Sequence, residues 1–426
     1  MPPDLVGVLA EPNRRRLLEL LVFGEQSVSQ LASQFGVTRS AVSQHLGVLA
    51  DTGLVQARRE GRFRYYRVIP GGMAALRDAL DVFWTKELEQ LAAVRPAIKG
   101  EGPMSVEKSI VVPLDADETF ALLTQPERLR RWQAVTARLD LRAGGEYRWT
   151  IVPGHTAAGE IASIEPGKRV VFTWGWEDSE DLPPGASTVT ITLEPTQGGT
   201  LVRLIHEGLT PDQVTGHSAG WDHYLERLAV AGRTGDAGAD DWASAPEPLD
   251  QLSAAEASLA ACQLVLRGLK PGDGGSPSPC KNFNVDEVVD HLIGSIAHLG
   301  AAAGGSITSS TEGKAETRVA NAAQEALEAW RRRGLEGSVK LGPGEMPARL
   351  AANIFSVEFL VHAWDVAQAS SQSLEASDVL TGYVLELARE LIAPPMRDGD
   401  RFAAEVQVGL DDDNLQRLIA FTGRTV

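Results

Sequence analysis

The chain has 426 residues, which is too long for a single hydrophobic core and suggests roughly three domains. A hydrophobic content of 43% suits globular folding, and no apolar run reaches the roughly 18 residues needed to span a bilayer. No basic segment leads into an apolar one at the start, so we expect a cytoplasmic protein with no membrane partner. The only cysteines, Cys262 and Cys280, exclude a disulfide framework and fit a reducing compartment.

The net charge of −17 argues against a nucleic-acid partner until it is divided by region. Residues 1–100 contain 13 Lys and Arg against 10 Asp and Glu, whereas the remainder contains 27 against 47. The first hundred residues are therefore net positive. The acidic remainder would repel DNA and keep non-specific binding low.

The first elements predicted are three helices that form a helix-turn-helix domain. Pro12 suits the first turn of a helix that ends at Gly24, and Ser27 with Gln30 has the spacing of a capping box. Thr38 can cap the helix that follows, whose apolar face is Ala41, Val42, Leu46 and Leu49. The residues predicted to read base edges in a major groove are Thr38, Arg39, Ser40, Ser43, Gln44 and His45.

A basic hairpin and an apolar helix complete this first domain. Strand-like residues flank Glu60-Gly61, which predicts a hairpin with Gly61 at its tip. The arginines predicted to contact phosphates or the minor groove are Arg58, Arg59, Arg62 and Arg64. The helix from about Met73 to Val94 has more apolar surface than so small a domain needs, so we expect it to form a dimer contact.

Residues about 5 to 95 resemble the winged helix-turn-helix of the ArsR-type repressor family, and the string VTRSAVSQHLGVLADTGLV is the most specific part. The resemblance implies a homodimer that binds double-stranded DNA at a palindromic operator, and the family leans to repression. Metal-sensing members carry a cysteine-rich patch where this chain has EQSVSQLA, so metal control at that position is not expected. Winged helices also serve as protein-docking modules, and this alternative stays open. We assign the domain to residues 1–98.

After the linker AIKGEGPMS, residues 105–232 predict a strand, short helices, a meander of strands and a long closing helix. They resemble the START-like superfamily, in the branch of activator-of-heat-shock-ATPase homologues, which implies an α/β helix-grip fold with an apolar pocket between sheet and helix. The predicted pocket walls are Trp132, Trp149, Trp174, Trp176, Trp221 and Tyr224. Any one of these rings can instead belong to the core.

Histidines of this second domain show no spacing that argues for metal ligation, and the segment contains no nucleophile, base and orienter set. We therefore expect it to bind a small apolar ligand rather than to catalyse a reaction.

The linker GRTGDAGADDWASAPEP leads to a third, helical domain, which we assign to residues 246–426. Helices are predicted at about 249–268, 285–303, 317–332, 347–372 and 377–392, and the segment RFAAEVQVGL near the C-terminus is strand-like. A short helix in DDDNLQRLIAFTGR closes the chain. The predicted fold class is therefore multidomain α+β.

Titratable side chains interrupt two apolar helices of the third domain. His291 and His298 fall on the apolar stripe of one predicted helix, and Glu358, His362 and Asp365 share a face of another. One carboxylate and two imidazoles can make a three-ligand divalent site with open positions. Spacing alone also fits an ordinary helix-surface pair and a satisfied core histidine.

Residues about 248 to 426 resemble the DinB-like metal-binding four-helix family that includes mycothiol-dependent maleylpyruvate isomerase. The matching segments are SPCKNFNVDEVVDHL, EFLVHAWDVAQA and LQRLIAFTGR. The resemblance implies a zinc site made by His291, Glu358 and His362. We expect His298 to be a reserve ligand and Asp365 to orient a ligand. Cys280 is a conceivable thiol near the site or a small buried residue.

The sequence therefore predicts a dimeric DNA-binding regulator, a repressor by family, controlled by a small apolar ligand, by a metal or thiol, or by both. The alternative is a metal- and thiol-dependent isomerase or transferase that carries an autoregulatory DNA-binding domain. Metal binding alone does not decide between catalysis, sensing and a structural role.

Overall fold

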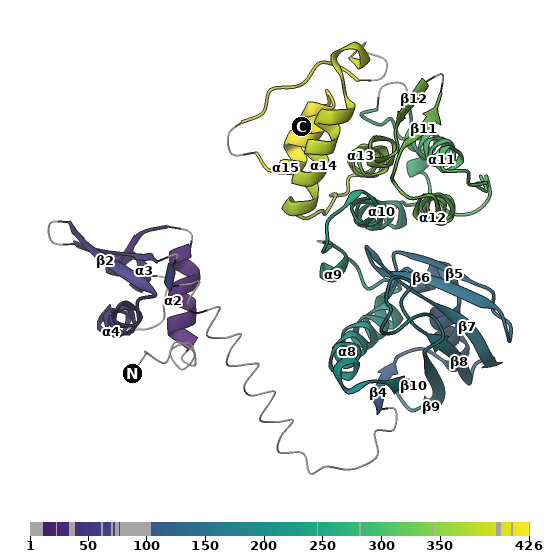
Figure 1. Cartoon of the computed structure of the whole chain (residues 1–426), viewed down its shortest axis with the longest axis horizontal. Coiled ribbons are helices and arrows are strands. Elements are labelled where there is room, and N and C mark those ends of the chain that lie inside the picture. Colours follow the sequence, from purple (N-terminus) through teal and green to yellow (C-terminus); the bar gives the residue numbers. More distant parts are fainter. Residues whose placement is uncertain are drawn as a thin grey trace. The chain divides into compact units, whose positions relative to one another are not determined.

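The computed structural model describes residues 12–22, 24–33, 39–60, 63–69, 71–72, 76, 104–244, 246–280, 283–342, 344–397, 402–409 and 412–425. The chain divides into two compact units, Met1–Gly102 and Pro103–Val426. Figure 1 labels their helices and strands, and each unit is described by itself.

Unit 1 is a winged helix-turn-helix. Its described elements are α2 (Pro12–Val22), β1 (Gln26–Ser27), α3 (Val28–Ser33), α4 (Arg39–Asp51), β2 (Val55–Glu60) and β3 (Phe63–Val68). The strands pair antiparallel in the order β1-β3-β2. The predicted apolar face of α4 forms the core, because Val42, Leu46 and Leu49 are fully buried against Leu17 of α2 and Leu31 of α3.

The predicted capping box at the start of α3 is confirmed. The Ser27 amide donates to Gln30 Oε1 at 2.8 Å, and the Gln30 amide donates to Ser27 Oγ at 3.3 Å. The predicted dimer helix, about Met73 to Val94, lies outside the described residues apart from Leu76, which is buried in the core of unit 1.

Unit 2 begins with an antiparallel sheet that packs against a long helix, and we call this part the sheet module. Its strands are ordered β4-β10-β9-β8-β7-β6-β5. In chain order the elements are β4 (Met104–Val112), α6 (Ala116–Thr124), α7 (Pro126–Leu129), β5 (Thr136–Leu139), β6 (Glu146–Val152), β7 (His155–Glu165), β8 (Arg169–Trp174), β9 (Ser187–Thr196), β10 (Gly199–Leu209) and α8 (Pro211–Thr234).

Local sequence explains how the sheet module forms. Burial alternates along β9, with Val189, Ile191 and Leu193 turned inward, as expected for a strand with one face on a core. Thr210 and Gln213 form a capping box that starts α8, and Gly235 ends the helix with a φ of 84°, a conformation that favours glycine. Figure 1 shows α8 lying against the sheet, which matches the predicted helix-grip architecture.

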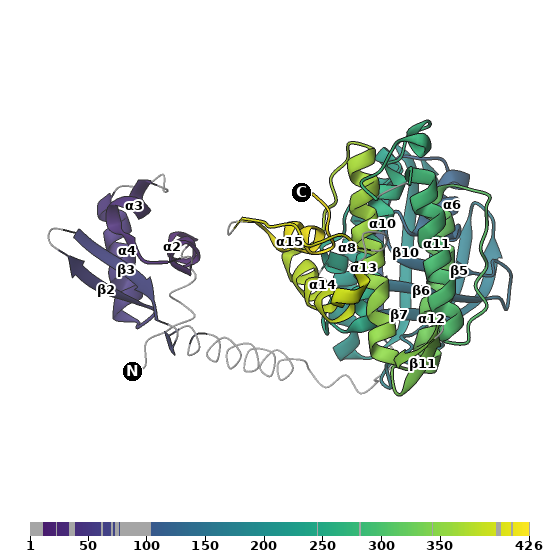
Figure 2. The same ribbon diagram turned by 90° about the horizontal axis from the view of Figure 1, so that it is seen from above.

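A connector, residues 235–250, carries the short helix α9 (Asp241–Ser244) and leads to the helical module. The helical module comprises α10 (Gln251–Arg267), η1 (Asp273–Gly275), α11 (Val285–Ala302), α12 (Ala315–Arg333), β11 (Ser338–Leu341), β12 (Gly344–Pro347), α13 (Ala348–Ala369), α14 (Asp378–Leu391), η2 (Pro394–Met396) and α15 (Asn414–Phe421). Figure 2 shows α10, α11, α12 and α13 side by side, and they share one hydrophobic core.

Two features of the helical module differ from the sequence prediction. The hairpin formed by β11 and β12 was not predicted, because its strands have only four residues each. The strand predicted in RFAAEVQVGL is wrong for the described residues 402–409, which form no ladder. Val406 instead donates its amide to the Ala420 carbonyl of α15, and the Ala403 carbonyl accepts from Arg397.

Among the described residues, α13 is the one helix long and apolar enough to cross a membrane by length and composition. Of its most apolar stretch, 83% is buried inside the helical module, as is typical of the core helix of a globular domain. Glu358, His362 and Asp365 interrupt the apolar run of this helix, which is why the sequence shows no uninterrupted apolar span.

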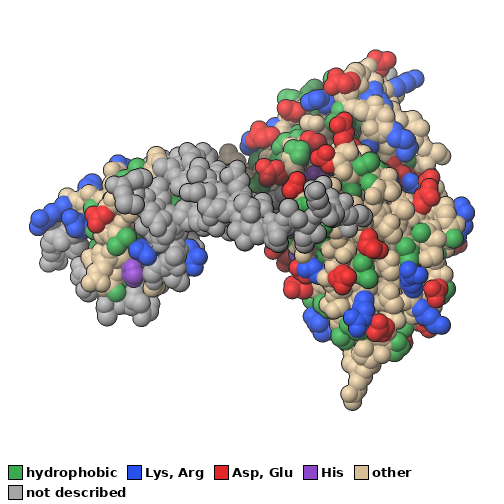
Figure 3. All heavy atoms as spheres, turned by 60° about the horizontal axis from the view of Figure 1, so that its bottom comes forward, with side chains coloured by type: hydrophobic (Ala, Val, Ile, Leu, Met, Phe, Trp, Pro, Cys, Tyr) green, Lys and Arg blue, Asp and Glu red, His purple; other side chains and the backbone are tan. Residues whose placement is uncertain are grey.

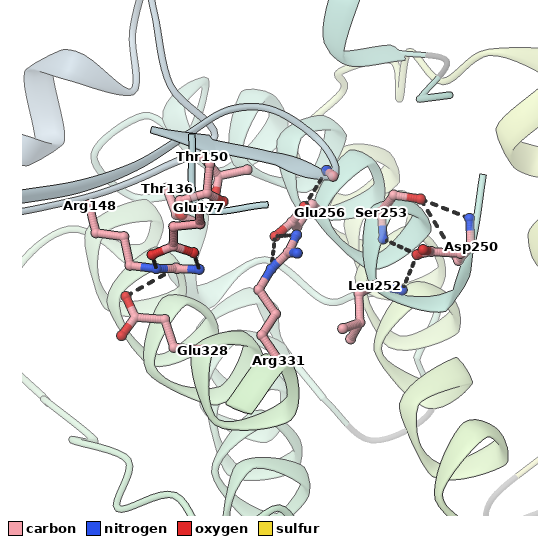
Figure 4. Close-up of polar contacts among 12 residues, drawn as sticks. Thr136, Arg148, Thr150, Glu177, Asp250, Leu252, Ser253, Glu256, Glu328 and Arg331 are labelled. Atoms are coloured by element: carbon pink, nitrogen blue, oxygen red, sulfur yellow. Dashed lines mark hydrogen bonds and ion pairs between the residues drawn. The ribbon is translucent and has the colours of Figure 1, made fainter. Parts of the chain in front are cut away.

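Buried ion pairs join the sheet module to the helical module. Arg130, after α7, donates to both carboxylate oxygens of Glu316 in α12 at 2.8 and 3.2 Å, and their side chains are only 1% and 5% exposed. Figure 4 shows a second contact, in which Glu256 of α10 accepts from Arg331. The other carboxylate oxygen of Glu256 accepts from the Gly154 amide in the turn between β6 and β7.

A third contact of the same interface is also drawn in Figure 4. Arg148 of β6 forms a bidentate pair with Glu177 and lies 3.3 Å from Glu328 of α12. Figure 3 shows acidic and basic side chains interspersed over the visible face of unit 2, which fits a surface organised by local pairs rather than by one sign of charge.

Candidate functional site

The predicted DNA-reading residues lie on or next to α4. Ser43 and Gln44 are exposed and His45 is half-buried, so polar side chains are available on one side of the helix. Thr38 lies outside the described residues, and for Arg39 and Ser40 only the helical backbone is described. This arrangement has the polar face that a recognition helix needs.

The wing hairpin brings arginines face to face. Arg59 of β2 and Arg64 of β3 are directly opposite across the ladder, and both are exposed. Like charges in this position repel, so an anion that bridges them would relieve the repulsion. Arg62 lies outside the described residues.

Arg58 of the wing has contacts within unit 1 that the sequence did not reveal. Its guanidinium donates to both oxygens of Glu25 at 3.2 and 2.9 Å and lies over the Tyr65 ring. The hydrogen bond and charge of Arg58 lower the pKa of Glu25. Arg58 is therefore partly neutralised within unit 1 before any phosphate arrives.

The sheet module contains a cavity of about 340 Å³ between the sheet and α8. Among the predicted walls, Trp174, Trp176, Trp221 and Tyr224 line it. Its size and its aromatic lining are within the range of small-molecule sites. Its other lining residues are Gln133, Ile151, Val152, Asp212, Gln213, Gly216, His217, Gly220 and Trp242.

Trp132 and Trp149 are core residues rather than walls of this cavity. The Trp132 indole donates to the Leu122 carbonyl at 2.9 Å, and Trp149 packs against Tyr147 with ring centroids 4.2 Å apart. Both side chains are buried in the main core of the sheet module. An alternating strand pattern predicts which rings face inward but not which of them lie beside a void.

Two of the lining residues outside the predicted set of walls carry aromatic rings. His217 belongs to α8, and Trp242 belongs to the connector, where it stacks on His223 with ring centroids 4.1 Å apart and planes 2° apart. Nothing in the local pattern around Trp242 identifies it, because its position depends on how the connector returns across α8.

A buried histidine, His206, is hydrogen-bonded to the wall residue Trp221. Trp221 donates to His206 Nδ1 at 3.1 Å, so the ring proton of His206 resides on Nε2, which lies 2.8 Å from Ser187 Oγ. Ser187 donates in turn to the Trp174 carbonyl. Burial, with His217 nearby, lowers the pKa of His206 to about 3, so this histidine is neutral.

The predicted metal-ligand residues converge in the helical module. Glu358 Oε2 lies 3.6 Å from His291 Nε2 and 3.7 Å from His362 Nε2, and the two imidazole rings are 5.0 Å apart. The three potential ligand atoms therefore surround one small volume. His291 is more exposed than predicted, at 40% of its side chain, because it lies at the edge of the buried face of α11. His298 is exposed and belongs to no such group among the described residues.

Asp365 and Arg424 hold the His362 ring of this cluster in place through hydrogen bonds. Asp365 Oδ2 lies 3.0 Å from His362 Nδ1, and both Asp365 oxygens accept from Arg424 at 2.7 Å. Burial opposes the ionisation of Asp365, but the contacts with His362 and Arg424 outweigh it and lower its pKa. An acceptor on Nδ1 orients the imidazole and leaves Nε2 directed toward Glu358.

The pKa values of the two histidines in the cluster are shifted in opposite directions. Burial lowers the pKa of His291. Burial also disfavours charged His362, but hydrogen bonds from His362 to Asp365 and Cys280, together with the nearby carboxylates, raise its pKa to about 10. Glu358 Oε2 is buried without a hydrogen-bond partner among the described residues, which is costly for a carboxylate unless something else binds it.

Comparison with known proteins follows the same division of the chain. The family described as "Bacterial regulatory protein, arsR family" matches residues 11–57, and "Activator of Hsp90 ATPase homolog 1-like protein" matches residues 113–232. The HTH-type transcriptional regulator Rv2034 of Mycobacterium tuberculosis is 48% identical over 80 residues, which are 19% of this chain and 75% of that protein. The chain therefore belongs to the arsR family of bacterial regulatory proteins, whose members bind DNA.

Two further relatives match other lengths of the chain. An uncharacterized protein of M. tuberculosis, Rv0738, is 29% identical over 185 residues, which are 42% of this chain and all of that protein. The solution structure of an AHSA1-like protein from Rhizobium etli is 35% identical, covers 33% of this chain and 88% of its own, and has a TM-score of 0.29.

Proposed function

We propose that this protein is a homodimeric repressor that binds a palindromic operator and changes its DNA affinity when a small apolar molecule occupies the cavity of the sheet module. The DNA-binding part rests on membership of the arsR family. The single observation that carries the ligand-controlled part is the aromatic cavity of about 340 Å³ between the sheet and α8.

The DNA-binding surface combines α4 with the wing. Ser43 and Gln44 supply groups that hydrogen-bond to base edges, and the opposed Arg59 and Arg64 supply positive charge for phosphates. The acidic remainder of the chain favours a protein that binds weakly to DNA in general and tightly only at its own site.

The test is a fluorescence-anisotropy titration of the full chain with DNA from its own promoter region and with scrambled DNA of equal length. We expect a preference for the promoter DNA, an affinity that falls steeply with salt, and a sequence preference that is lost in Gln44→Ala. Equal binding to both DNAs by the unaltered chain would overturn the regulator proposal.

We propose further that His291, Glu358 and His362 hold a divalent ion, with zinc the expected metal, in a helical module of the DinB-like kind. Two imidazole nitrogens and one carboxylate oxygen are a donor set that zinc accepts, and the orphaned Glu358 Oε2 would gain a partner. Asp365 would keep the His362 ring oriented. When bound, such an ion supplies a Lewis-acid position that a thiol or water can occupy.

Elemental analysis of the purified full chain tests the metal site. We expect about one zinc per chain, and its loss in His362→Ala and Glu358→Gln. His298→Ala is the matched control, because this histidine lies on the same helix as His291 but outside the cluster. Metal content that survives both cluster variants would contradict the assignment.

The second candidate function is a metal- and thiol-dependent isomerase or transferase with an autoregulatory DNA-binding domain. The observation that favours it is the 40% exposure of His291, which leaves the cluster open to an incoming molecule. If the DNA affinity of Glu358→Gln still responds to the ligand, the cavity alone controls DNA binding. A response that disappears with the metal favours the enzyme-like site.

A further inference from the structure

Polar atoms in the cavity of the sheet module have no partner within the protein. Trp174 and His217 both line the cavity, and Trp174 Nε1 and His217 Nε2 are buried without a hydrogen bond to any described residue. Buried polar groups are nearly always paired, because an unpaired one keeps the full cost of leaving water. Two such atoms beside one cavity therefore indicate what its occupant should offer.

The two orphaned atoms have opposite hydrogen-bonding roles. His217 Nδ1 lies 2.8 Å from the Gln213 carbonyl, an acceptor, so the ring proton resides on Nδ1 and Nε2 presents a lone pair. Burial lowers the pKa of His217, which keeps the ring neutral. The Trp174 indole N–H can only donate. The cavity thus offers one acceptor and one donor.

Neighbouring polar groups do not satisfy these atoms. Both ring nitrogens of His206 are already used, by Ser187 and by Trp221. The Tyr224 hydroxyl is buried close to Asp240, and burial together with this carboxylate raises its pKa far above the usual range. Tyr224 therefore remains a protonated phenol and is a third polar group on the wall.

The rings and the charges that line the cavity further limit the class of ligand that can bind there. Trp174 lies 5.4 Å from Trp221 and 5.4 Å from Trp176 between ring centroids, at interplanar angles of 53° and 82°. Such tilted and edge-on rings pack well against another flat ring. The described lining includes no Lys or Arg, and Asp212 is its charged residue, so an anionic ligand would find no counter-charge.

We propose that the cavity binds an uncharged aromatic molecule that carries a hydroxyl group. The hydroxyl donates to His217 Nε2 and accepts from the Trp174 indole, while the ring fills the space between Trp174, Trp176 and Trp221. This inference rests on the proposed function only in taking the cavity as the ligand site, and it adds the chemical class of the ligand.

The experiment compares three probes of nearly equal shape on the full chain by calorimetric titration. The probes are 2-naphthol, naphthalene and 2-naphthoate. We expect 2-naphthol to bind about three- to tenfold more tightly than naphthalene, the gain of one or two neutral hydrogen bonds, and 2-naphthoate to bind most weakly. Equal affinity for 2-naphthol and naphthalene, or tighter binding of 2-naphthoate, would overturn the proposal.

Variants assign the preference to the two residues. Trp174→Phe and His217→Phe should each reduce the preference for 2-naphthol over naphthalene while changing naphthalene affinity by less than about twofold. Trp149→Phe is the matched control, because its indole N–H is also buried and orphaned in the same module but does not line the cavity. A loss of preference in Trp149→Phe as large as in Trp174→Phe would refute the assignment. The probe series on the unaltered chain tests the ligand class even if a variant does not fold.

A separate titration with promoter DNA distinguishes this inference from the proposed function. If 2-naphthol binds as expected and DNA affinity does not change, the ligand class stands and ligand control of DNA binding fails. If none of the three probes binds while DNA binding persists, the ligand class fails and the DNA-binding part of the proposed function stands.

Discussion

His206 lies in the middle of the sheet module as a neutral imidazole. It accepts from Trp221 and lies against Ser187, and burial lowers its pKa to about 3. A free histidine takes up a proton near pH 6.5, so the unfolded chain binds more protons than the folded chain between these values. Because of this linkage, the contribution of neutral His206 to stability is fully present above pH 6.5 and is lost as the pH decreases toward 3.

We predict that unit 2 loses up to about 1.4 kcal/mol of stability per pH unit from His206 as the pH falls below 6.5. His217, whose pKa burial also lowers, adds in the same direction. Urea unfolding at pH 6.5, 5.8 and 5.0 measures the slope in a range where few carboxylates titrate. His206→Gln keeps an acceptor and a donor without titrating and should flatten the slope. His155→Gln, at an exposed histidine of the same module, should leave it unchanged. Equal slopes for the unaltered chain and His206→Gln would exclude this account.

Arg130 and Glu316 form the most buried ion pair between the two modules of unit 2. Burial opposes the ionisation of Glu316, but the hydrogen bonds and charge of Arg130, with the charge of Arg267, lower its pKa. The carboxylate therefore stabilises the fold above its unfolded pKa of 4.5, and this stabilisation is lost as the pH falls through the lower folded value.

Removing one partner leaves the other buried and unpaired. We predict that Glu316→Ala lowers the free energy of unfolding at pH 7 by about 3 to 5 kcal/mol. Urea unfolding of the full chain measures this loss. Glu194→Ala is the control, because Glu194 pairs with Arg203 at the surface, with side chains 50% and 54% exposed, and should cost less than about 1 kcal/mol. Similar losses in the two variants would argue against a specific role for the buried pair.

In the wing hairpin, the register of strand pairing decides which side chains face each other. Arg59 and Arg64 face each other because the two strands pair residue for residue from Val55 and Val68 toward the tip. A one-residue slip would separate these arginines and turn the buried Tyr66 outward. Their opposition is therefore set by the same register that buries the core of unit 1.

We predict that Arg64→Ala weakens binding of the full chain to promoter and scrambled DNA by similar factors and reduces the salt slope by about one. The physical reason is the loss of one phosphate contact without loss of base reading. Anisotropy titrations at several salt concentrations measure both quantities. Arg142→Ala, at an exposed arginine of the sheet module that pairs with Asp140, should change neither. A variant that alters sequence preference instead would make Arg64 a base-reading residue.

Local elements were predictable from the sequence because their causes are local. The capping box at Ser27 depends on residues three apart and was predicted with its partner Gln30. The convergence of Glu358 and His362 with His291 also followed, since two of the three share a helix face. The hairpin of β11 and β12 was missed because four-residue strands carry little periodic signal.

At the scale of the whole molecule, contacts between distant segments were beyond the sequence pattern. Arg130 and Glu316 are 186 residues apart, and Gly154 and Glu256 are 102 apart. The sequence around these residues does not identify them as partners, because each resembles an ordinary surface charge or a turn glycine. For the same reason, the sequence predicted only some of the residues that line the cavity. Strand alternation turned Trp149 and Trp174 inward, and only the path of α8 and the connector decided which ring met the void.

The connector makes the cavity depend on both modules of unit 2. Trp242 closes part of the wall while Ser244, two residues later, accepts a hydrogen bond from Ser377 at the start of α14. The similarity to activator-of-Hsp90-ATPase homologues ends at residue 232, before this tryptophan. A molecule that displaced Trp242 would pull on a connector whose anchor to the helical module, at Ser244, lies twelve residues beyond the family boundary. The cavity wall therefore draws on residues beyond the family match, and a fragment cut at residue 232 would lose Trp242 together with the Ser244–Ser377 contact that holds the connector.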